Sequence, residues 1–521
     1  MKPNADLFTL NGSVASTKIE TRWLFVSNHL NLMYMMAAGL VMPPKGFGNK
    51  YYQDTLAAYP GWIPLFANDV PKDAIAYSVS ERNHLIPCIA TMNLTSLKGK
   101  VMAIDSNGLA KEINFPEELD GSEHILLVPA PLPIHWITSV AFQSKERKSA
   151  CEADARDFGN VPLQSFVRDI NANLFSKGSE SPWPDTDIVV KSKDVVLDVP
   201  FAAGGIMAML LHYGNLGDVG MQASRLAFDS ENDVTESISD PIISSLGKWM
   251  QSANHINSDD ISTSLFWGAV LKLAECRFAD PPSNPREVLL SYLLSTADGM
   301  ESRMKHALIK LAEDLRAISV FSDKTITEIF ERHPKSFSRV MTLLFLRDNC
   351  EDLLAFKHSL LTETDTIAAA ILFAARDGWL GLPIKLRNFS DSYASVQHRM
   401  ASMAHRLGNT NIELGPPPAR PKPLRELFFP SKKGWSTVQA SAALNLAREY
   451  KWSCIQTRII LGKGEYIMAI DGAGLHLIIP GEAKVVKTEV DVVKFLDDLA
   501  STEISDKESL KVRNQLKAVE V

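Results

Sequence analysis

The chain contains few cysteines, and none is placed to pair with another or to hold a metal. Five cysteines are spread over 521 residues without a C-x-x-C pair. A disulfide framework and a thiolate zinc site are therefore not indicated, and we expect reduced thiols that pack as small apolar side chains. The five are Cys88, Cys151, Cys276, Cys350 and Cys454.

Long hydrophobic runs are also missing. The longest strongly apolar run, residues 201–211, contains two glycines and is shorter than the roughly 20 residues that a bilayer-spanning helix needs. Residues 1–6 lack the apolar core of a signal peptide. We therefore expect a cytoplasmic protein that does not enter a membrane.

Complete catalytic and cofactor motifs are absent as well. The sequence has neither H-E-x-x-H nor G-x-S-x-G. Residues 46–50 are rich in glycine and end in lysine, but their spacing is not that of a phosphate-binding loop. His398 and His405 lie seven residues apart on one predicted helix face, and no third ligand accompanies them. From these patterns we predict no metal, no catalytic residue and no cofactor.

Three carboxylates, Glu152, Asp154 and Asp157, lie close together in the sequence. They leave two interpretations open, a carboxylate cluster or the solvated face of a helix. Because charge runs on helices are usually solvated faces, we favour the second interpretation.

Length and composition indicate several soluble domains. The chain is 45% apolar and 22% charged, with 54 Lys and Arg against 61 Asp and Glu and a net charge of −7. It is too long for one ordinary core, and its mild charge argues against a protein that coats nucleic acid along its length. The proline-rich stretch 415–423 can join neither a helix nor a central strand, so it predicts a stiff tether.

The predicted fold class is a multidomain α+β protein. Its parts are a mixed α/β N-terminal domain at 1–177, a central all-α bundle at 188–410, a proline-rich basic linker at 411–433 and a small C-terminal α-β-β-β-α module with a charged tail at 434–521. The boundaries follow shifts in composition, such as the run of glycine, serine and proline at 178–185.

A strand followed by a helix opens the N-terminal domain. Residues 22–26 form a short apolar strand candidate, and Asn28 is placed to cap a helix that ends at Gly39. Residues 46–71 are rich in glycine, proline and aromatic side chains, which predicts an ordered loop. Further strands are predicted at 86–90, 101–104, 125–128 and 134–142.

Helical spacing dominates the central part of the chain, and strand spacing the last. Apolar residues recur every three or four positions between residues 202 and 407, which predicts the bundle, and residues 188–199 predict a strand pair leading into it. In the last module, helices are predicted from Ser436 and from Thr488 on either side of three strands. These strands are predicted at 454–461, 466–470 and 475–479.

Cations and aromatic side chains are interleaved along the linker and its exit. Such a pattern suits single-stranded nucleic acid, because cations neutralise phosphates while aromatic rings stack on bases. A solvated linker whose segment 427–429 docks back on a domain is a second interpretation, and a strap that docks a partner is a third. The contact residues in question are Arg420, Lys422, Arg425, Phe428, Phe429, Lys432, Lys433 and Trp435.

The opening of the N-terminal domain resembles that of the DarT-like ADP-ribosyltransferases. In that family a strand, a short polar stretch and a helix that ends in Gly-Leu begin the NAD-binding fold. Residues 134–142, together with Val128-Pro129, are similar to the closing strands of the family. The segments that carry the resemblance at the opening are Trp23-Leu24-Phe25-Val26-Ser27, Asn31-Leu32 and Gly39-Leu40.

The resemblance covers residues 21–145 and implies where a dinucleotide would bind. It implies that Arg22, Ser27 and His29 would contact NAD. The family's first strand carries a histidine that holds the nicotinamide ribose, and the matching residue here is Phe25, which makes no hydrogen bond through its side chain. For the catalytic glutamate, Glu123 and Glu146 are the candidates, and Glu146 would activate the acceptor.

Three functional hypotheses follow. The first is a non-enzymatic interaction or regulatory component of a larger cytosolic bacterial assembly, with a protein partner, because a tether raises the local concentration of the last module near whatever the body binds. The second is NAD-dependent ADP-ribosyl transfer to nucleic acid or protein, with NAD as cofactor. The third is single-stranded nucleic-acid binding through the linker. We favour the first, because no finished active site is present.

Overall fold

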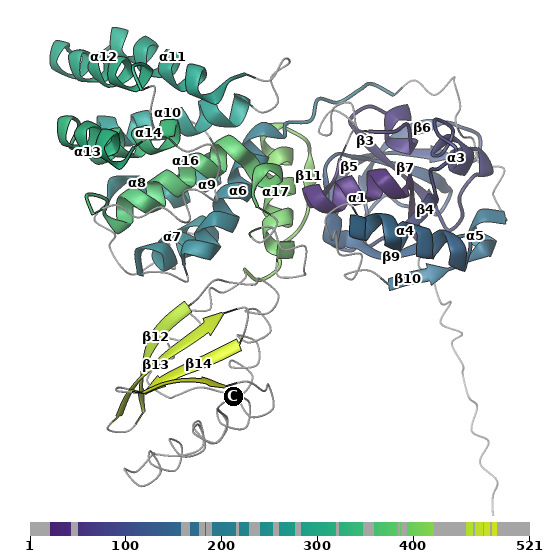
Figure 1. Cartoon of the computed structure of the whole chain (residues 1–521). Coiled ribbons are helices and arrows are strands. Elements are labelled where there is room, and N and C mark those ends of the chain that lie inside the picture. Colours follow the sequence, from purple (N-terminus) through teal and green to yellow (C-terminus); the bar gives the residue numbers. More distant parts are fainter. Residues whose placement is uncertain are drawn as a thin grey trace, which may run out of the picture.

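A nine-stranded mixed sheet forms the N-terminal part of the chain in the computed structural model (Figure 1). Its strands are ordered β10-β9-β4-β1-β3-β7-β5-β11, and β6 pairs with β5 outside this path. The strands are β1 (Trp23–Asn28), β3 (Trp62–Ala67), β4 (Pro87–Met92), β5 (Lys98–Asp105), β6 (Ala110–Phe115), β7 (Glu123–Pro129), β9 (Ile137–Phe142), β10 (Val167–Ile170) and β11 (Ile412–Glu413). The structure describes residues 21–42, 51–157, 167–176, 183, 190–214, 218–228, 240–253, 260–276, 283–318, 322–346, 359–383, 386, 393–420, 455–461, 464–471, 474–479 and 482–486.

Strand β1 lies inside the sheet with all six residues buried. Successive side chains of a strand point to opposite faces, and β1 follows this rule. Trp23 and Phe25 join one hydrophobic core, whereas Leu24 and Val26 join the other. The predicted strand is thus confirmed, and the sheet is covered on both faces.

Helix α1 (His29–Ala38) begins and ends where the sequence predicts. The side chain of Asn28 caps it by accepting a hydrogen bond from the amide of Asn31 at 2.9 Å. Gly39 ends it with a φ of 75°, the left-handed conformation that glycine adopts at low cost.

The prediction of a loop at residues 46–71 is wrong where the structure describes this stretch. Residues 55–67 contain the short helix α2 (Thr55–Ala58) and β3, an interior strand of the sheet. Pro64 lies inside this strand, although proline lacks the amide hydrogen that an interior strand uses for pairing. Pro64 is tolerated because it pairs only with β7. The pairing of β3 with β1 is confined to Phe66 and Ala67.

Two further segments differ from the sequence prediction. Residues 134–142 begin with a 3-10 turn, η3 (Ile134–Trp136), before β9 starts. In the described part of the predicted strand pair, residues 190–197 form neither helix nor strand, and the next two residues already belong to a helix. This segment crosses the start of β3, where the indole of Trp62 donates to the carbonyl of Lys191 at 2.9 Å.

Gly61 is where this crossing is tightest. Its φ is +83°, and a Cβ there would lie 2.1 Å from the carbonyl oxygen of Lys193. We expect Gly61→Ala to lower the free energy of unfolding by about 2–4 kcal/mol, measured by urea denaturation. The matched control is Gly121→Ala, where φ is +88° and no atom lies within 4 Å of the added carbon. Equal losses in the two variants would contradict the close crossing.

A body of helices follows the sheet, and α6 (Asp198–Tyr213) is its buried centre. It packs on α16 (Glu363–Gly381) and α17 (Ala394–Leu407), and a Cβ on Gly205 would lie only 2.7 Å from the carbonyl oxygen of Ala374. The predicted helical character of this part is confirmed within the described residues. Its other helices are α7 (Asp218–Phe228), α8 (Pro241–Ser244), α9 (Leu246–Ser252), α10 (Ile261–Cys276), α11 (Pro285–Asp298), α12 (Ser302–Arg316), α13 (Asp323–Arg332) and α14 (Ser336–Leu346).

Helix α17 joins the helical body to the sheet, and Figure 1 shows it between the two. It contacts η3, β11 and β8 (Leu132–Pro133), the last of which pairs with β2 (Leu40–Val41). One hydrophobic core runs from the sheet into the helices. Two residues of the predicted linker, Ile412 and Glu413, form β11 and pair with β5 at the sheet edge.

The last strands form a separate antiparallel sheet of four, one more than the sequence predicts. They are β12 (Ile455–Leu461), β13 (Gly464–Asp471), β14 (Gly474–Ile479) and β15 (Glu482–Val486). The missed strand, β15, is short and carries two charged residues, so its apolar alternation is weak. The helices predicted from Ser436 and Thr488 lie outside the described residues.

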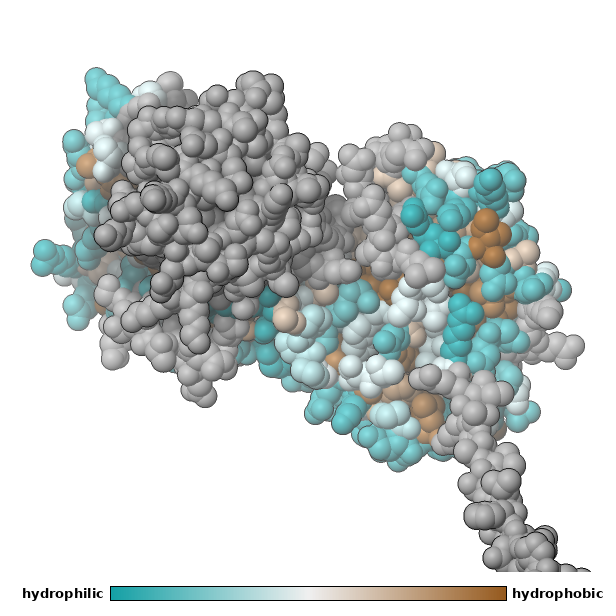
Figure 2. Space-filling model, turned by 90° about the horizontal axis from the view of Figure 1, so that it is seen from below, coloured by the Kyte–Doolittle hydropathy of each residue, from teal (hydrophilic) through white to brown (hydrophobic). Residues whose placement is uncertain are grey.

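Polar residues cover most of the described surface seen in Figure 2, with apolar residues in small, scattered groups. Scattered apolar residues are normal on a protein surface and mark no interface by themselves. Among the described helices, none combines the length and the apolar character that crossing a bilayer requires.

Candidate functional site

Polar side chains gather at the end of β1, where the resemblance places NAD contacts. Ser27 and Asn28 close the strand, and His29 and Asn31 belong to the first turn of α1. All four are at most 2% exposed. Buried polar groups need hydrogen-bond partners, so the identity of those partners shows what these residues do.

Asp54 is the centre of this group. Its carboxylate is fully buried and accepts hydrogen bonds from Ser27 Oγ and Tyr51 Oη at 2.5 Å each. It also accepts from Asn31 Nδ2 and from the amide of Leu56 at 3.0 Å each, which caps α2. Burial raises the pKa of Asp54, and the hydrogen bonds that it accepts offset part of that rise. We call these five residues the Asp54 cluster.

Both ring nitrogens of His29 also make hydrogen bonds. Its Nδ1 accepts from the amide of Ile86 at 3.1 Å, so Nε2 carries the proton and donates to Asp154 at 2.9 Å. Burial lowers the pKa of His29, although Asp154 opposes this, so the ring is neutral near pH 7. Two of the three carboxylates of helix α4 (Lys145–Asp157) have separate partners, since Asp154 bonds to His29 and Glu152 pairs with Arg168 at 2.8 Å. The side chain of Asp157 lies outside the described residues.

Arg22 lies away from Ser27 and His29. Its guanidinium donates to the hydroxyl of Thr91 at 2.7 and 3.1 Å. Five residues of extended strand separate it from Ser27, a distance of about 16 Å. The structure therefore brings Ser27 and His29 together but places Arg22 at the opposite end of β1.

Phe25 is the residue that the resemblance would match to the ribose-binding histidine of the family. Its side chain is fully buried in the core that the sheet shares with the helices. A phenyl ring in that core contributes to packing and leaves no polar atom at the strand.

The two candidate glutamates are not part of the Asp54 cluster. Glu123 opens β7 at the end of the sheet where β1 starts, and its carboxylate accepts from the amides of Asp120 and Gly121. Glu146 lies in the first turn of α4, with its carboxylate held by Ser144. It precedes Asp154 by eight residues, or about 12 Å along the helix axis.

Of the predicted contact residues in and after the linker, only Arg420 is described, and it is half-buried. Before it, His398 Nε2 donates to the carbonyl of Gly415 at 3.1 Å, which fixes the start of the tether to α17. The other predicted contact residues lie outside the described residues: Lys422, Arg425, Phe428, Phe429, Lys432, Lys433 and Trp435.

Sequence reasoning missed Asp54 and Tyr51, the two residues that organise the buried group. The available signal was the sequence Asp54-Thr55-Leu56, since aspartate followed by helix-forming residues is a common helix start. Within the described part of the chain, no three His, Cys, Asp or Glu residues are grouped so that they could hold a metal ion.

Comparison with known proteins gives a partial structural likeness. No protein-family model matches the chain, and no curated protein matches it. The structure of Thermus sp. 2.9 DarT in complex with carba-NAD+ matches with a TM-score of 0.24 at 14% identity, covering 30% of this chain and 97% of that one. The same protein in complex with ADP-ribosylated ssDNA matches with a TM-score of 0.23 at 13% identity, covering 30% of this chain and 96% of that one. This is a weak, partial resemblance, and it carries no argument about function.

Proposed function

We propose that the protein acts by binding and not by catalysis, as a non-enzymatic interaction or regulatory component of a larger assembly. The observation that carries this proposal is the state of the polar groups at the end of β1. Asp54 accepts four hydrogen bonds from its neighbours, and both ring nitrogens of His29 are occupied.

Use of Asp54 or His29 as a catalytic or ribose-binding group would require one of these bonds to break. A general base must come within hydrogen-bond distance of the proton that it removes, and a ribose-binding group needs a free donor or acceptor. If a ligand displaced a hydrogen bond of the Asp54 cluster, the buried donor of that bond would need a new acceptor. The arrangement therefore supports a structural role for the cluster, as the fastening between β1, α1 and α2.

The attachment of the tether supports a binding role for the whole chain. The shared core makes one unit of the sheet and the helices, and His398 holds the tether at Gly415. The chain thus leaves this unit from a defined place. A module carried on a stiff tether stays near whatever the unit binds, which raises its effective concentration there.

The proposal predicts no transfer of ADP-ribose. The full chain is incubated with NAD+ labelled in its adenylate part and with a mixture of single-stranded DNA and RNA. We expect no label on nucleic acid or protein above the level seen with heat-denatured chain. In native extract of the producing cells we expect the protein to migrate well above the 57.5 kDa of one chain. Label transfer, or migration as a monomer, would count against the proposal.

ADP-ribosyl transfer is the second candidate, and the placement of Ser27 and His29 at one end of β1 favours it. Glu146 lies in the first turn of the helix that follows β9, and β9 ends beside β4 at this same end of the sheet. In this reading, label transfer would be lost in His29→Ala and Glu146→Gln. Binding of single-stranded nucleic acid through the linker stays a prediction, and a salt-dependent gel shift lost on neutralising Arg420, Lys422 and Arg425 would support it.

A further inference from the structure

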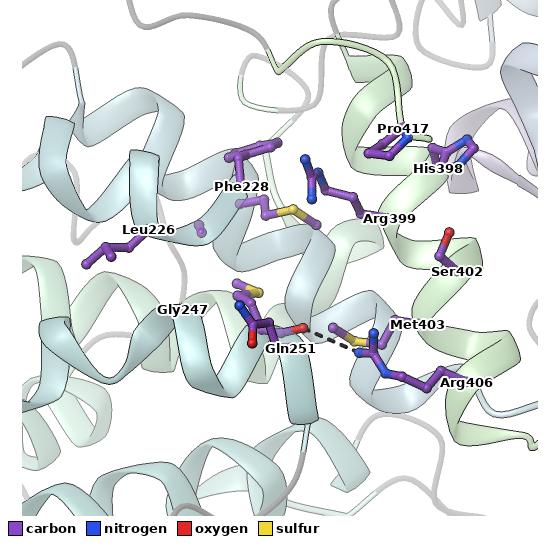
Figure 3. Close-up of a pocket in the computed structure, with 13 residues that line it drawn as sticks. Leu226, Phe228, Gly247, Gln251, His398, Arg399, Ser402, Met403, Arg406 and Pro417 are labelled. Atoms are coloured by element: carbon purple, nitrogen blue, oxygen red, sulfur yellow. Dashed lines mark hydrogen bonds between the residues drawn. The ribbon is translucent and has the colours of Figure 1, made fainter. Parts of the chain in front are cut away.

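A cavity of about 240 Å³ lies in the helical body, with walls from α6, α7, α9 and α17 (Figure 3). Its two arginines already contact groups of the protein. Arg406 donates to the carbonyl of Met250 at 3.4 Å, the dashed line in Figure 3. Arg399 donates to the hydroxyl of Ser395 at 3.4 Å, and its guanidinium lies 5.5 Å from the ring centre of Phe228. The lining of this cavity therefore indicates no particular class of ligand.

A pair of buried cysteines connects β4 to α4. Cys88 lies on β4 and is 2% exposed, and Cys151 lies on α4 and is fully buried. The two residues are 63 positions apart in the sequence, yet their thiols share a hydrogen bond in the folded chain. Both are free thiols. Sequence spacing gave no sign of this contact, because the contact depends on how α4 packs against the sheet.

The contacts of His29 bring β4 and α4 together at this point. Ile86, which precedes β4, accepts from the amide of His29 at 2.9 Å, and its own amide donates to Nδ1 of the ring at 3.1 Å. On its other side the ring donates to Asp154 at 2.9 Å. The thiol of Cys88 donates to the same carbonyl of Ile86 at 3.6 Å, and Cys151 lies one helical turn before Asp154. Both cysteines are therefore linked to one imidazole, one of them through Ile86 and the other through Asp154.

Cys88 holds its proton firmly. Burial raises the pKa of its thiol well above the usual value, and the neighbouring Cys151 raises it further. Because the thiolate is the reactive form of cysteine, Cys151 is the thiol that reacts first with an oxidant. Most residues in the first two turns of α4 are exposed, so a local opening of this helix brings a small oxidant to Cys151.

We propose that Cys88 and Cys151 form a redox-sensitive pair, which hydrogen peroxide converts into a disulfide bond between β4 and α4. The bond fastens α4 beside His29, and a thiol reductant releases it. This modification site is independent of the function proposed above.

The disulfide forms in two steps, with one peroxide as the oxidant. The sulfur of Cys151 attacks one peroxide oxygen and the O–O bond breaks, which leaves a sulfenic acid on Cys151. The other oxygen leaves as hydroxide and becomes water with the proton of Cys151. The sulfur of Cys88 then attacks the sulfur of Cys151, the S–O bond breaks, and the departing hydroxide becomes a second water with the proton of Cys88. Two thiols are thereby oxidised to one disulfide, and one peroxide is reduced to two waters.

Peptide mapping of the full chain tests the proposal. The protein is reduced, treated with hydrogen peroxide, denatured in N-ethylmaleimide to block the remaining thiols, and digested without reductant. We expect a cross-linked pair of peptides that holds Cys88 and Cys151, in protein that migrates as a single chain. Dithiothreitol is expected to separate the pair. Recovery of both cysteines as separate blocked peptides, or bonded to other cysteines, would overturn the proposal.

Variants and stability show what the bond does. Cys88→Ala and Cys151→Ala are each expected to lose the cross-linked pair. The matched control is Cys276→Ala on α10, a buried cysteine whose thiol also donates to a carbonyl, and it is expected to keep the pair. Oxidation of the parent chain is expected to raise the urea midpoint of unfolding by on the order of 1 M, because the bond closes a long loop in the unfolded chain. A disulfide that forms without moving this midpoint would contradict the fastening of α4.

Discussion

Replacing Asp54 with alanine is expected to lower the free energy of unfolding by about 3 kcal/mol or more. The carboxylate has no exposed surface, and it is the shared acceptor for the side chains of Ser27, Tyr51 and Asn31 and for the amide of Leu56. Alanine would remove this acceptor from all four donors at once, although Asn31 Nδ2 keeps its bond to the carbonyl of Tyr52 at 2.7 Å. Since a domain is stable by only about 5–15 kcal/mol, the loss would be large.

Urea denaturation measures this effect, and two further variants interpret it. Asp54→Asn keeps the shape but presents an NH2 group to neighbours that donate, so it is also expected to destabilise the protein. Asp240→Ala is the matched control, because Asp240 caps α8 by accepting from the amides of Ile242 and Ile243 and has no comparable side-chain partners in the part of the chain that the structure describes. Loss of an ordinary cap costs about 1 kcal/mol.

The sign of the Asp54 result also bears on function. Residues kept for catalysis or ligand binding are often held at a cost in stability, so that replacing them stabilises the protein. A more stable Asp54→Ala variant would therefore identify the end of β1 as a retained ligand site. It would favour the transferase hypothesis over the proposed binding role.

Local features of the fold were predictable from the sequence. The side chain of Asn28 and the φ of Gly39 set the bounds of α1, and each acts within a few residues of its own position. The residues Asp105–Gly108 are typical of a turn, and the structure has one there, since the amide of Gly108 donates to the carbonyl of Asp105 between β5 and β6. Helical spacing likewise indicated α10, α12 and α17, because amphipathic periodicity is a local signal.

Features that depend on distant partners were not predictable. Strand β3 tolerates Pro64 only because of how the neighbouring strands pair with it. Strand β11 forms only because its residues pair with the edge of β5, which lies more than 300 positions earlier in the chain. His29 and Asp154 are 125 residues apart, so nothing in the spacing of the α4 carboxylates pointed to that contact. Arg399 and Arg406 share a predictable face of α17, but Met207 and Met250, which line the same cavity, come from α6 and α9.

Acid is expected to weaken the junction between α17 and the sheet, because neutral histidines are buried there. His405 Nε2 donates to the carbonyl of Pro131 at 2.8 Å, and its Nδ1 accepts from Thr410 at 2.8 Å. Burial lowers the pKa of His405 to about 4, with a smaller contribution from the charge of Lys193. Burial, with His398 nearby, lowers the pKa of His135 to about 4 as well.

The direction of the effect follows from proton binding. In the unfolded chain these imidazoles titrate near 6.5, so between pH 6.5 and pH 4 the unfolded state binds more protons than the folded state. The stabilisation is fully present above pH 6.5, declines as the pH falls towards 4, and changes no further below that. A shift of this size corresponds to at most about 3 kcal/mol for each histidine. The pKa of Asp54 is raised, so Asp54 contributes in the opposite sense.

Comparing variants isolates the contribution of the histidines to the pH dependence of stability, because all the variants retain Asp54 and its opposing contribution. The free energy of unfolding is measured in urea at pH 7.5, 6, 5 and 4 for the parent chain and for His405→Gln, whose amide still donates to Pro131. His405→Gln is expected to lose less stability than the parent between pH 6.5 and pH 4. His306→Gln on the exposed side of α12 is expected to follow the parent, because its imidazole is not buried. If the curve of His405→Gln runs parallel to that of the parent, His405 is not the group whose protonation loosens this junction.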